Sequence, residues 1–245
     1  MAKRHSKNGE ALWLYGFHAV AGALANPRRH CRRCLLTRAA AEKIGVRALV
    51  RVRAEIVAPD QVTRVLPQGA VHQGVALACD PLTPMSLAEI TALPERKIIL
   101  ILDQIADPHN VGAILRSAAA FDAAAVVVQE RHAPSESGAL AKAASGALDV
   151  VPYLSVVNIA RTLEQLGEAG FWRVALTGDA GQSLAEAIVS RDLALVMGSE
   201  GTGIRRLVRE RCDDSATIPI SSRMESLNVS NAAAIVLYEC RRVNR

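Results

Sequence analysis

Continuous apolar runs, separated by stretches of helical periodicity, constrain the fold of this chain more than any other feature. The runs are KIILILD, AAVVV, WRVALT and LALVMG, at residues 97–103, 124–128, 172–177 and 193–198. Strands of a parallel sheet typically have this composition because helices bury both faces of the sheet. A further strand is expected at 216–220, before a last helix from about 228 to 243. The C-terminal part is therefore predicted to be an α/β domain with a parallel sheet.

A smaller α/β module is predicted ahead of this sheet. Its expected elements are a helix at 19–25, a strand at 34–37, a helix from about residue 40 and a strand at 74–79. Residues 81–96 contain three prolines and no sustained apolar face, as is typical of a linker. We therefore divide the chain into a basic flexible tail at 1–12, an N-terminal domain at 13–80, a linker at 81–96 and a second domain at 97–245.

The distribution of basic residues indicates a polyanionic partner without establishing one. The net charge is +5 and the pI is about 9.2, which also suits enzymes with unrelated substrates. Basic residues gather in the tail and near the start of the N-terminal domain: Lys3, Arg4, Lys7, Arg28, Arg29, Arg32 and Arg33. These arginines could contact phosphates or form a solvated face. Aromatic residues make up only 3% of the chain, which favours recognition of RNA by shape and backbone over base stacking.

Membrane and metal-centred classes of protein receive little support. No apolar run approaches the roughly 18 residues of a membrane span, and the first ten residues lack the apolar core of a signal peptide, so a cytoplasmic protein is expected. The chain has five cysteines, of which only Cys31 and Cys34 form a C-x-x-C pair, and no second pair stands at zinc spacing. We interpret them as free thiols and expect no metal.

Ligands of open parallel sheets bind beyond the carboxyl ends of the strands, so the loops after residues 103, 177, 198 and 220 are the candidate site. The first loop carries Asn110-Val111-Gly112 and then Arg116. Asn110 could cap the following helix and leave backbone N–H groups free for an anion, although an ordinary cap and a surface arginine would have the same sequence. The loop lacks G-x-G-x-x-G, which counts against a nucleotide-dependent oxidoreductase.

Two further motifs follow the later strands. Residues 198–203 hold three glycines around Glu200, and glycine permits positive φ and close approach of backbone to a ligand. Residues 218–220 read Ile-Pro-Ile, and Ser226, Asn228, Ser230 and Asn231 open the last helix. These polar groups exceed what one helix cap needs and indicate a site, although a capping network is the alternative.

Together, N-x-G-x-x-x-R, M-G-S-E-G-x-G and I-P-I with S-L-N-V-S resemble the three motifs of the SpoU (TrmH) family of SPOUT methyltransferases. Residues 15–24 and 70–77 resemble the ends of the L30e-like substrate-binding domain that precedes this catalytic domain. Residues 142–163 resemble the branch that methylates a guanosine ribose in 23S rRNA. The resemblance implies an L30e-like N-terminal domain, a parallel-sheet catalytic domain with a C-terminal trefoil knot, and a homodimer.

The resemblance also implies the cofactor and the site residues. S-adenosylmethionine would be held largely by loop backbone at Thr177, Gly198, Ile218 and Leu227. The positions that match the family's catalytic residues are Asn110, Arg116, Glu200, Ser226 and Asn228. This chain has Ser222 where the family commonly has glycine, so the loop after Pro219 is expected to pack differently around the methionine moiety.

The expected activity is transfer of a methyl group to the ribose 2′-OH of a guanosine in structured RNA, with 23S rRNA as the expected substrate and no DNA or membrane partner. A tRNA substrate and a noncatalytic RNA-binding or ribosome assembly factor on the same fold are the alternatives. Because a guanidinium is a poor base, we expect Arg116 to activate the hydroxyl by hydrogen bonding and to hold the adjacent phosphate. Glu200 is expected to orient Arg116, while Asn110, Ser226 and Asn228 position the ribose and the loop.

Overall fold

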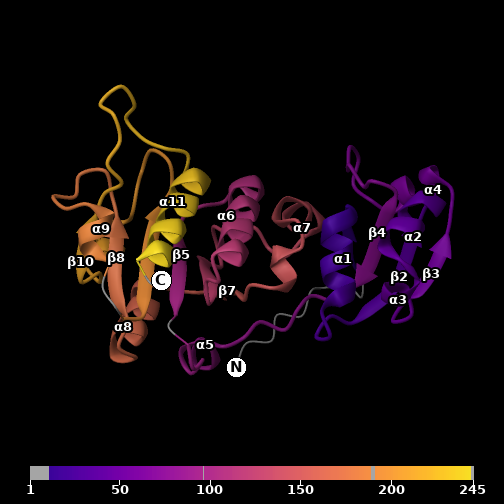
Figure 1. The fold of residues 1–245 in the computed structure, drawn as a ribbon, viewed down its shortest axis with the longest axis horizontal. Helices are drawn as coiled ribbons and strands as arrows, with labels where there is room; N and C mark the ends of the chain where they lie inside the picture. Colours follow the sequence, from indigo (N-terminus) through magenta and orange to yellow (C-terminus); the bar gives the residue numbers. More distant parts are fainter. Residues whose placement is uncertain (1–10, 96, 189–190, 244–245) are drawn as a thin grey trace.

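The computed structural model describes residues 11–95, 97–188 and 191–243, which form two β-sheets placed at opposite ends of an elongated molecule (Figure 1). The basic residues Lys3, Arg4 and Lys7 lie outside the described residues. The smaller sheet has the order β1-β4-β2-β3, and the larger has the order β10-β8-β9-β5-β6-β7. Both sheets carry helices, so the predicted α/β class is confirmed.

The N-terminal sheet is built around β4, whose five residues are all buried. Its strands are β1 (Leu12–Tyr15), β2 (Cys31–Leu36), β3 (Arg53–Ile56) and β4 (Val75–Cys79). Its helices are α1 (Phe17–Ala25), α2 (Arg38–Ile44), α3 (Val46–Leu49) and α4 (Pro59–Arg64). Strand β4 pairs antiparallel with β1 and β2, and β3 pairs parallel with β2. The edge strands β1 and β3 were not predicted from the sequence, and the start of β2 was predicted three residues late.

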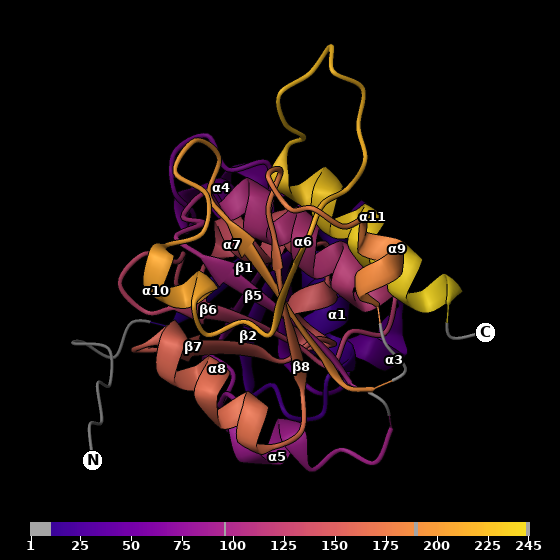
Figure 2. The same ribbon diagram turned by 90° about the vertical axis from the view of Figure 1, so that its left-hand side faces the viewer.

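The larger sheet is parallel throughout, as predicted from the apolar runs. Its strands are β5 (Ile98–Asp103), β6 (Ala125–Gln129), β7 (Tyr153–Val156), β8 (Trp172–Leu176), β9 (Leu193–Gly198) and β10 (Asp214–Ala216). The strand expected at 216–220 is wrong, because β10 ends at Ala216. Proline has no N–H to donate to a ladder, so Pro219 belongs outside the sheet. The chain then rises from the sheet as a long loop before α11 (Figure 2).

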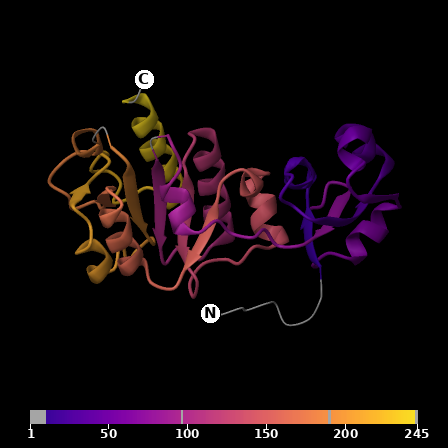
Figure 3. The same cartoon turned by 90° about the horizontal axis from the view of Figure 1, so that it is seen from below.

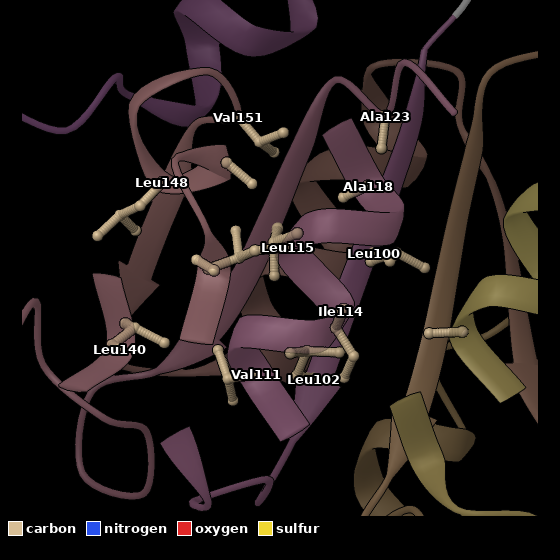
Figure 4. Packing of buried hydrophobic residues seen from close by; sticks show 14 of the residues in the cluster. Leu100, Leu102, Val111, Ile114, Leu115, Ala118, Ala123, Leu140, Leu148 and Val151 are labelled. Carbon is tan, nitrogen blue, oxygen red and sulfur yellow. The ribbon is translucent and has the colours of Figure 1, made fainter. Parts of the chain in front are cut away.

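Alternate residues of β5 face two separate hydrophobic clusters, one on each side of the sheet. Leu100 and Leu102 share a cluster with the buried residues of α6 (Pro108–Ala120), α7 (Gly138–Ala144), α9 (Leu184–Ala187) and α11 (Val229–Arg242). Ile99 and Ile101 share the other with α5 (Leu87–Thr91), α8 (Ile159–Glu168) and α10 (Arg206–Arg209). Figure 4 shows Val111 and Ile114 of α6 packed against the β5 leucines. This alternation follows from the two-residue period of a strand.

The stretch 81–96, expected as a linker, contains helix α5. Ser86 and Glu89 form a capping box at its start, and Ile90 is fully buried in the cluster that contains Ile99. The connection between the two sheets therefore packs on the larger one. The trefoil knot implied by the resemblance stays a prediction.

The two domains meet through close contacts between backbones. A β-carbon at Gly138, the first residue of α7, would overlap the carbonyl oxygen of Trp13 in β1. A β-carbon at Gly22 of α1 would lie 2.9 Å from the Cα of Gly146, just before the short 3₁₀ helix η1 (Ala147–Asp149). Gly138 lets α7 pack directly on β1, and Gly22 lets α1 pack against the start of η1; Figure 3 shows this junction from below.

A buried arginine ties the same two domains together electrostatically. Arg29 is only 2% exposed, its Nε donates to Asp149 at 2.9 Å, and its Nη1 is paired with Glu136 and donates to the Asp80 carbonyl at 3.2 Å. Burial opposes the charge, yet the two carboxylates raise the pKa of Arg29 above its ordinary value. Arg29 therefore neither contacts phosphate nor belongs to a solvated face, because its side chain is buried in the domain interface.

We predict that Arg29→Met destabilises the protein by about 3–5 kcal/mol, because it leaves two carboxylates without their buried partner. The fall in Tm should be about 10 °C, measured by calorimetry, and the radius of gyration in solution scattering should increase as the domains separate. Arg211→Met is the control, since its pair with Glu164 is about half exposed on both sides. Equal Tm values for the two variants would contradict the role of Arg29.

A second buried carboxylate fixes the loop that follows β9. Asp103, the last residue of β5, is fully buried and accepts hydrogen bonds from the backbone N–H of Arg205 at 2.9 Å and from its Nε at 2.8 Å. The Arg205 Nη2 lies 2.6 Å from the same carboxylate. The end of the central strand β5 thus holds the far end of the 199–205 loop by main-chain and side-chain bonds together.

We expect Asp103→Asn to cost about 3 kcal/mol of stability, because the amide removes the charge and turns an N–H toward a guanidinium that can only donate. The amide of Gly203, which donates to Ser199 O at 2.9 Å, should lose protection in hydrogen exchange. Asp60→Asn serves as the control, since Asp60 pairs with Arg64 at the surface. Unchanged exchange at Gly203 would show that the Asp103 charge does not hold the loop.

Candidate active site

The loops that follow β8, β9 and β10 meet where the strands of the larger sheet end. We call this edge the carboxyl edge. The loop after β9 is unusually tight, because a β-carbon at Gly198 would overlap the carbonyl carbon of Gly203. Gly201 and Gly203 adopt φ values of 92° and 66°, in the left-handed region that favours glycine. The long loop after β10 rises beside the start of α11 (Figure 1). The glycine spacing noted in the sequence is therefore a requirement of the backbone.

Asn228 joins the three motifs through its side-chain amide. Its Nδ2 donates to Asn110 Oδ1 at 3.0 Å and to Glu200 Oε1 at 2.9 Å, over sequence separations of 118 and 28 residues. Glu200 Oε1 also accepts the backbone N–H of Val229 at 3.2 Å. Asn228 Oδ1 meanwhile caps α11 by accepting from Ser230 N at 3.0 Å. Three of the five predicted catalytic residues therefore form one hydrogen-bonded cluster.

Two local roles expected from the sequence are wrong. Asp107 caps α6, accepting from the backbone N–H groups of His109 and Asn110 at 3.1 and 3.3 Å. Asn110 lies inside the first turn, so its side chain is free to bind Asn228. Glu200 does not orient Arg116, because its carboxylate is bonded to Asn228 and to the first turn of α11.

Arg116 and Ser226 lie near this cluster without belonging to it. Arg116 is six residues beyond Asn110 on α6, about 9 Å along the helix axis. Its side chain is exposed and has no hydrogen-bond or ion-pair partner among the described residues. Ser226 is exposed in the loop that precedes Asn228. Both side chains are thus available to a ligand that approaches from solvent.

A cavity of about 800 Å³ lies between the three loops, within the range of small-molecule sites. All four positions expected to hold the cofactor line it, namely Thr177, Gly198, Ile218 and Leu227. Glu200 and Ser226 line it too. The apolar wall residues Met197, Ile204 and Ala232 were not predicted, because Met197 and Ala232 look like ordinary core positions of a strand and a helix and Ile204 is a single apolar loop residue.

The chemistry of the wall fits S-adenosylmethionine. Apolar side chains would accept the adenine ring, and loop backbone offers donors and acceptors to its polar edges. The buried hydroxyl of Thr177 lies in the cavity wall and interacts with the Asp179 carboxylate. At the rim, a hydrogen bond from Arg209 at 2.9 Å lowers the pKa of Asp179 below its ordinary value, so this wall residue stays ionised.

The described residues contain neither a metal-binding cluster nor a membrane-spanning helix. Over residues 11–95, 97–188 and 191–243, no group of three or more His, Cys, Asp or Glu side chains is arranged to hold a metal ion. Cys31 and Cys34 are free thiols, both within β2. No described helix is long and apolar enough to cross a bilayer.

Curated relatives match nearly the whole chain. The 23S rRNA (guanosine-2′-O-)-methyltransferase RlmB of Nitrosomonas europaea is 38% identical over 240 residues, covering 93% of this chain and 90% of that protein. The enzyme of the same name from Vibrio vulnificus is 37% identical over 238 residues, covering 94% and 96%.

A solved structure has the same fold. The SpoU methyltransferase AviRb from Streptomyces viridochromogenes, in complex with AdoMet, superposes with a TM-score of 0.81 at 22% identity, covering 96% of this chain and 91% of that chain. Residues 13–85 match the family described as RNA 2′-O ribose methyltransferase substrate binding, and residues 97–238 match the SpoU rRNA Methylase family. Its three motifs are joined by one hydrogen-bonded cluster, and curated relatives match it over nearly the whole chain, so this chain belongs to the SpoU rRNA methylase family.

Proposed function

We propose that this protein transfers a methyl group from S-adenosylmethionine to the ribose 2′-hydroxyl of a guanosine in 23S rRNA. The observation that carries the proposal is the Asn110–Asn228–Glu200 cluster next to a cavity of cofactor size. The names of the relatives support the choice of substrate, since two relatives described as 23S rRNA guanosine enzymes match more than nine-tenths of the chain.

S-adenosylmethionine supplies an electrophilic methyl group on a positively charged sulfur. Thr177, Gly198, Ile218 and Leu227 would hold it against the cavity wall, with Met197 and Ile204 contributing apolar surface. Closely placed backbone around Gly198 leaves little freedom in the wall. A rigid wall lowers the cost of placing the methyl carbon about 3 Å from the attacking oxygen.

The remaining chemistry is activation of the ribose oxygen. A C–O bond forms as the C–S bond breaks, and the hydroxyl proton leaves to the adjacent phosphate or to water. Arg116 cannot accept this proton readily because the pKa of a guanidinium exceeds about 12. Arg116 instead donates hydrogen bonds to the hydroxyl oxygen and to the phosphate, which lowers the pKa of the hydroxyl.

Glu200 acts in this scheme by fixing Asn228. Its carboxylate holds the Asn228 amide and the N–H of Val229, so the start of α11 and the Asn228 side chain keep one orientation. Asn110 and Asn228 then present amide groups toward the ribose, and Ser226 approaches from the loop. Glu200 is therefore a positioning residue in this proposal.

The fold also supports a homodimer. Helix α11 leaves Ile235 and Tyr238 exposed at 41% and 55%, and residues three apart lie on one helix face. We infer that a second copy of the chain covers this face. RNA rather than DNA is the partner, because the accepting 2′-hydroxyl is absent from DNA. A ribosomal substrate implies action in the cytoplasm.

The first test measures tritium transfer from labelled S-adenosylmethionine to unmodified 23S rRNA and to bulk tRNA in parallel. Label in 23S rRNA, recovered in an alkali-resistant dinucleotide, is the expected result for 2′-O methylation. Label in tRNA alone would show that tRNA, and not 23S rRNA, is the substrate. Bound cofactor without label in either RNA would favour an assembly factor.

Arg116→Ala should abolish this transfer, and Arg116→Lys should lower kcat about a hundredfold, because lysine lacks the planar pair of donors. Single-turnover rates over a range of pH measure the effect on chemistry. Arg161→Ala, an exposed arginine on α8 across the sheet, is the control and should keep the wild-type rate. Near-wild-type turnover by Arg116→Lys would exclude the two-donor role.

Tyr238→Glu should convert the dimer to a monomer by placing a charge on the α11 face, as measured by sedimentation equilibrium. Val157→Glu is the matched control, because Val157 is 76% exposed at the end of β7 and lies outside this face. If Tyr238→Glu sediments like wild type, α11 is not the subunit interface.

A further inference from the structure

A row of contacts leads from the catalytic cluster across α7 to the N-terminal domain. Gly112, two residues beyond Asn110, allows α7 to approach α6, because a β-carbon there would overlap Ala143. The neighbouring residue, Lys142, reaches the other domain, and a β-carbon at Gly16 would lie 2.5 Å from its Cδ. Helices α6, α7 and α1 lie side by side in Figure 1. Lys142 is therefore about one helix spacing, near 10 Å, from the helix that carries Asn110 and Arg116.

Gln73 of the N-terminal domain meets Lys142 at this junction. Its Oε1 accepts from Lys142 Nζ at 2.6 Å and from the backbone N–H of Phe17 at 3.0 Å. Two donors saturate the lone pairs of this oxygen. What remains is the amide Nε2 of Gln73 and two N–H groups of the ammonium, so the unused polar groups of the pair are all donors. A site that offers only donors and one positive charge fits an anion.

The backbone at Gln73 is held in an unusual conformation. Its φ is 55°, a left-handed value that costs a residue with a side chain about 1 kcal/mol or more. The neighbours fix it, since His72 Nδ1 accepts from Gly74 N at 3.0 Å and Gly74 O accepts from Thr37 N at 2.8 Å. Strained residues held by their surroundings cluster at functional sites. The strain here presents the Gln73 side chain to Lys142.

The charge of Lys142 is not neutralised within the described part of the chain, because no carboxylate pairs with it there. Partial burial lowers its pKa below the ordinary value of lysine, which shows that the ammonium has lost hydration without gaining a counter-ion. The arginines nearer the start of the chain differ in this respect. Arg32 is paired with Asp80 and Arg33 with Glu55.

We propose that Lys142 and Gln73 together bind a backbone phosphate of the RNA strand whose ribose is methylated, in a site that neither domain forms alone. This inference rests on the proposed function and extends it to a second contact on the same strand. The short distance from Arg116 allows the bound phosphate to belong to a nucleotide a few positions from the target. The buried Arg29 interface keeps both halves of the site in register.

Gln73→Glu separates RNA binding from a purely structural role of this contact. Glutamate keeps the acceptor for Phe17 N and would form an ion pair with Lys142, so the contact between the domains is preserved or strengthened. It removes the amide donors and adds a negative charge against phosphate. Gln165→Glu makes the same charge change on α8, where Gln165 is exposed across the sheet, and is the matched control.

The experiment measures Kd and KM of the full-length protein for 23S rRNA, at two salt concentrations, together with Tm. Gln73→Glu and Lys142→Met should weaken RNA binding at least about fourfold at 0.15 M salt. They should also reduce the slope of log Kd against log salt concentration by about one, the value for one phosphate contact. The Tm of Gln73→Glu should not fall, kcat at saturating RNA should change little, and Gln165→Glu should match wild type.

Two results would overturn the proposal. If Gln73→Glu binds RNA with wild-type affinity and still methylates 23S rRNA, the contact between Gln73 and Lys142 has only a structural role. The proposed function would be unaffected by that result. An equal loss of RNA affinity in Gln73→Glu and Gln165→Glu would show that the loss comes from the change in net charge and not from a site at Gln73. Failure of the wild type to methylate either RNA would count against the proposed function alone, because the binding comparison still decides the site.

Discussion

The rest of the site depends on the interaction between the Asp103 carboxylate and Arg205. The carboxylate is fully buried at the end of the central strand and holds Arg205 by its main chain and its guanidinium. That bond fixes one end of the 199–205 loop, while the close contact of Gly198 with Gly203 fixes the other. Glu200 lies between them, so its position follows. Through Glu200, the start of α11 and the side chain of Asn228 are set as well.

The sequence predicted the four central strands of the larger sheet, β8, β9, β5 and β6, because they are mostly buried, but it did not predict the edge strand β7. A strand such as β9 must then be apolar throughout, and its predicted bounds match Leu193–Gly198. Edge strands have a less distinctive sequence pattern, because fewer of their residues are buried. Strand β3 reads RAEI, with three of its four residues exposed, and nothing local separates it from a loop. Strand β10 is three residues long and was placed too late, since the apolar residues after it line a cavity instead of pairing.

The site was predictable as a set of residues, and its contacts were not. The resemblance to the SpoU family identified Asn110, Glu200 and Asn228, and the structure brings these three together over as many as 118 residues of sequence. Which of them bonds to which depends on the meeting of three loops, which no local pattern encodes. Glu200 was thus assigned to Arg116 when Asn228 is its partner, and Asn110 was given the capping role of Asp107. Sequence patterns identify reactive groups, whereas tertiary packing chooses their neighbours.

The same distinction governs how the protein can hold a polyanion. The arginine-rich stretch at residues 28–33 is the most basic part of the described N-terminal domain, yet Arg29 is buried between two carboxylates and two of its neighbours have acidic partners. Charge that is neutralised internally adds little to phosphate affinity. Attraction for RNA must then come from cations without such partners, and two of these, Arg116 and Lys142, lie on the adjacent helices α6 and α7. Buried ion pairs of Arg29 hold the two domains together, and this arrangement places the unpaired cation Lys142 of the catalytic domain next to Gln73 of the N-terminal domain.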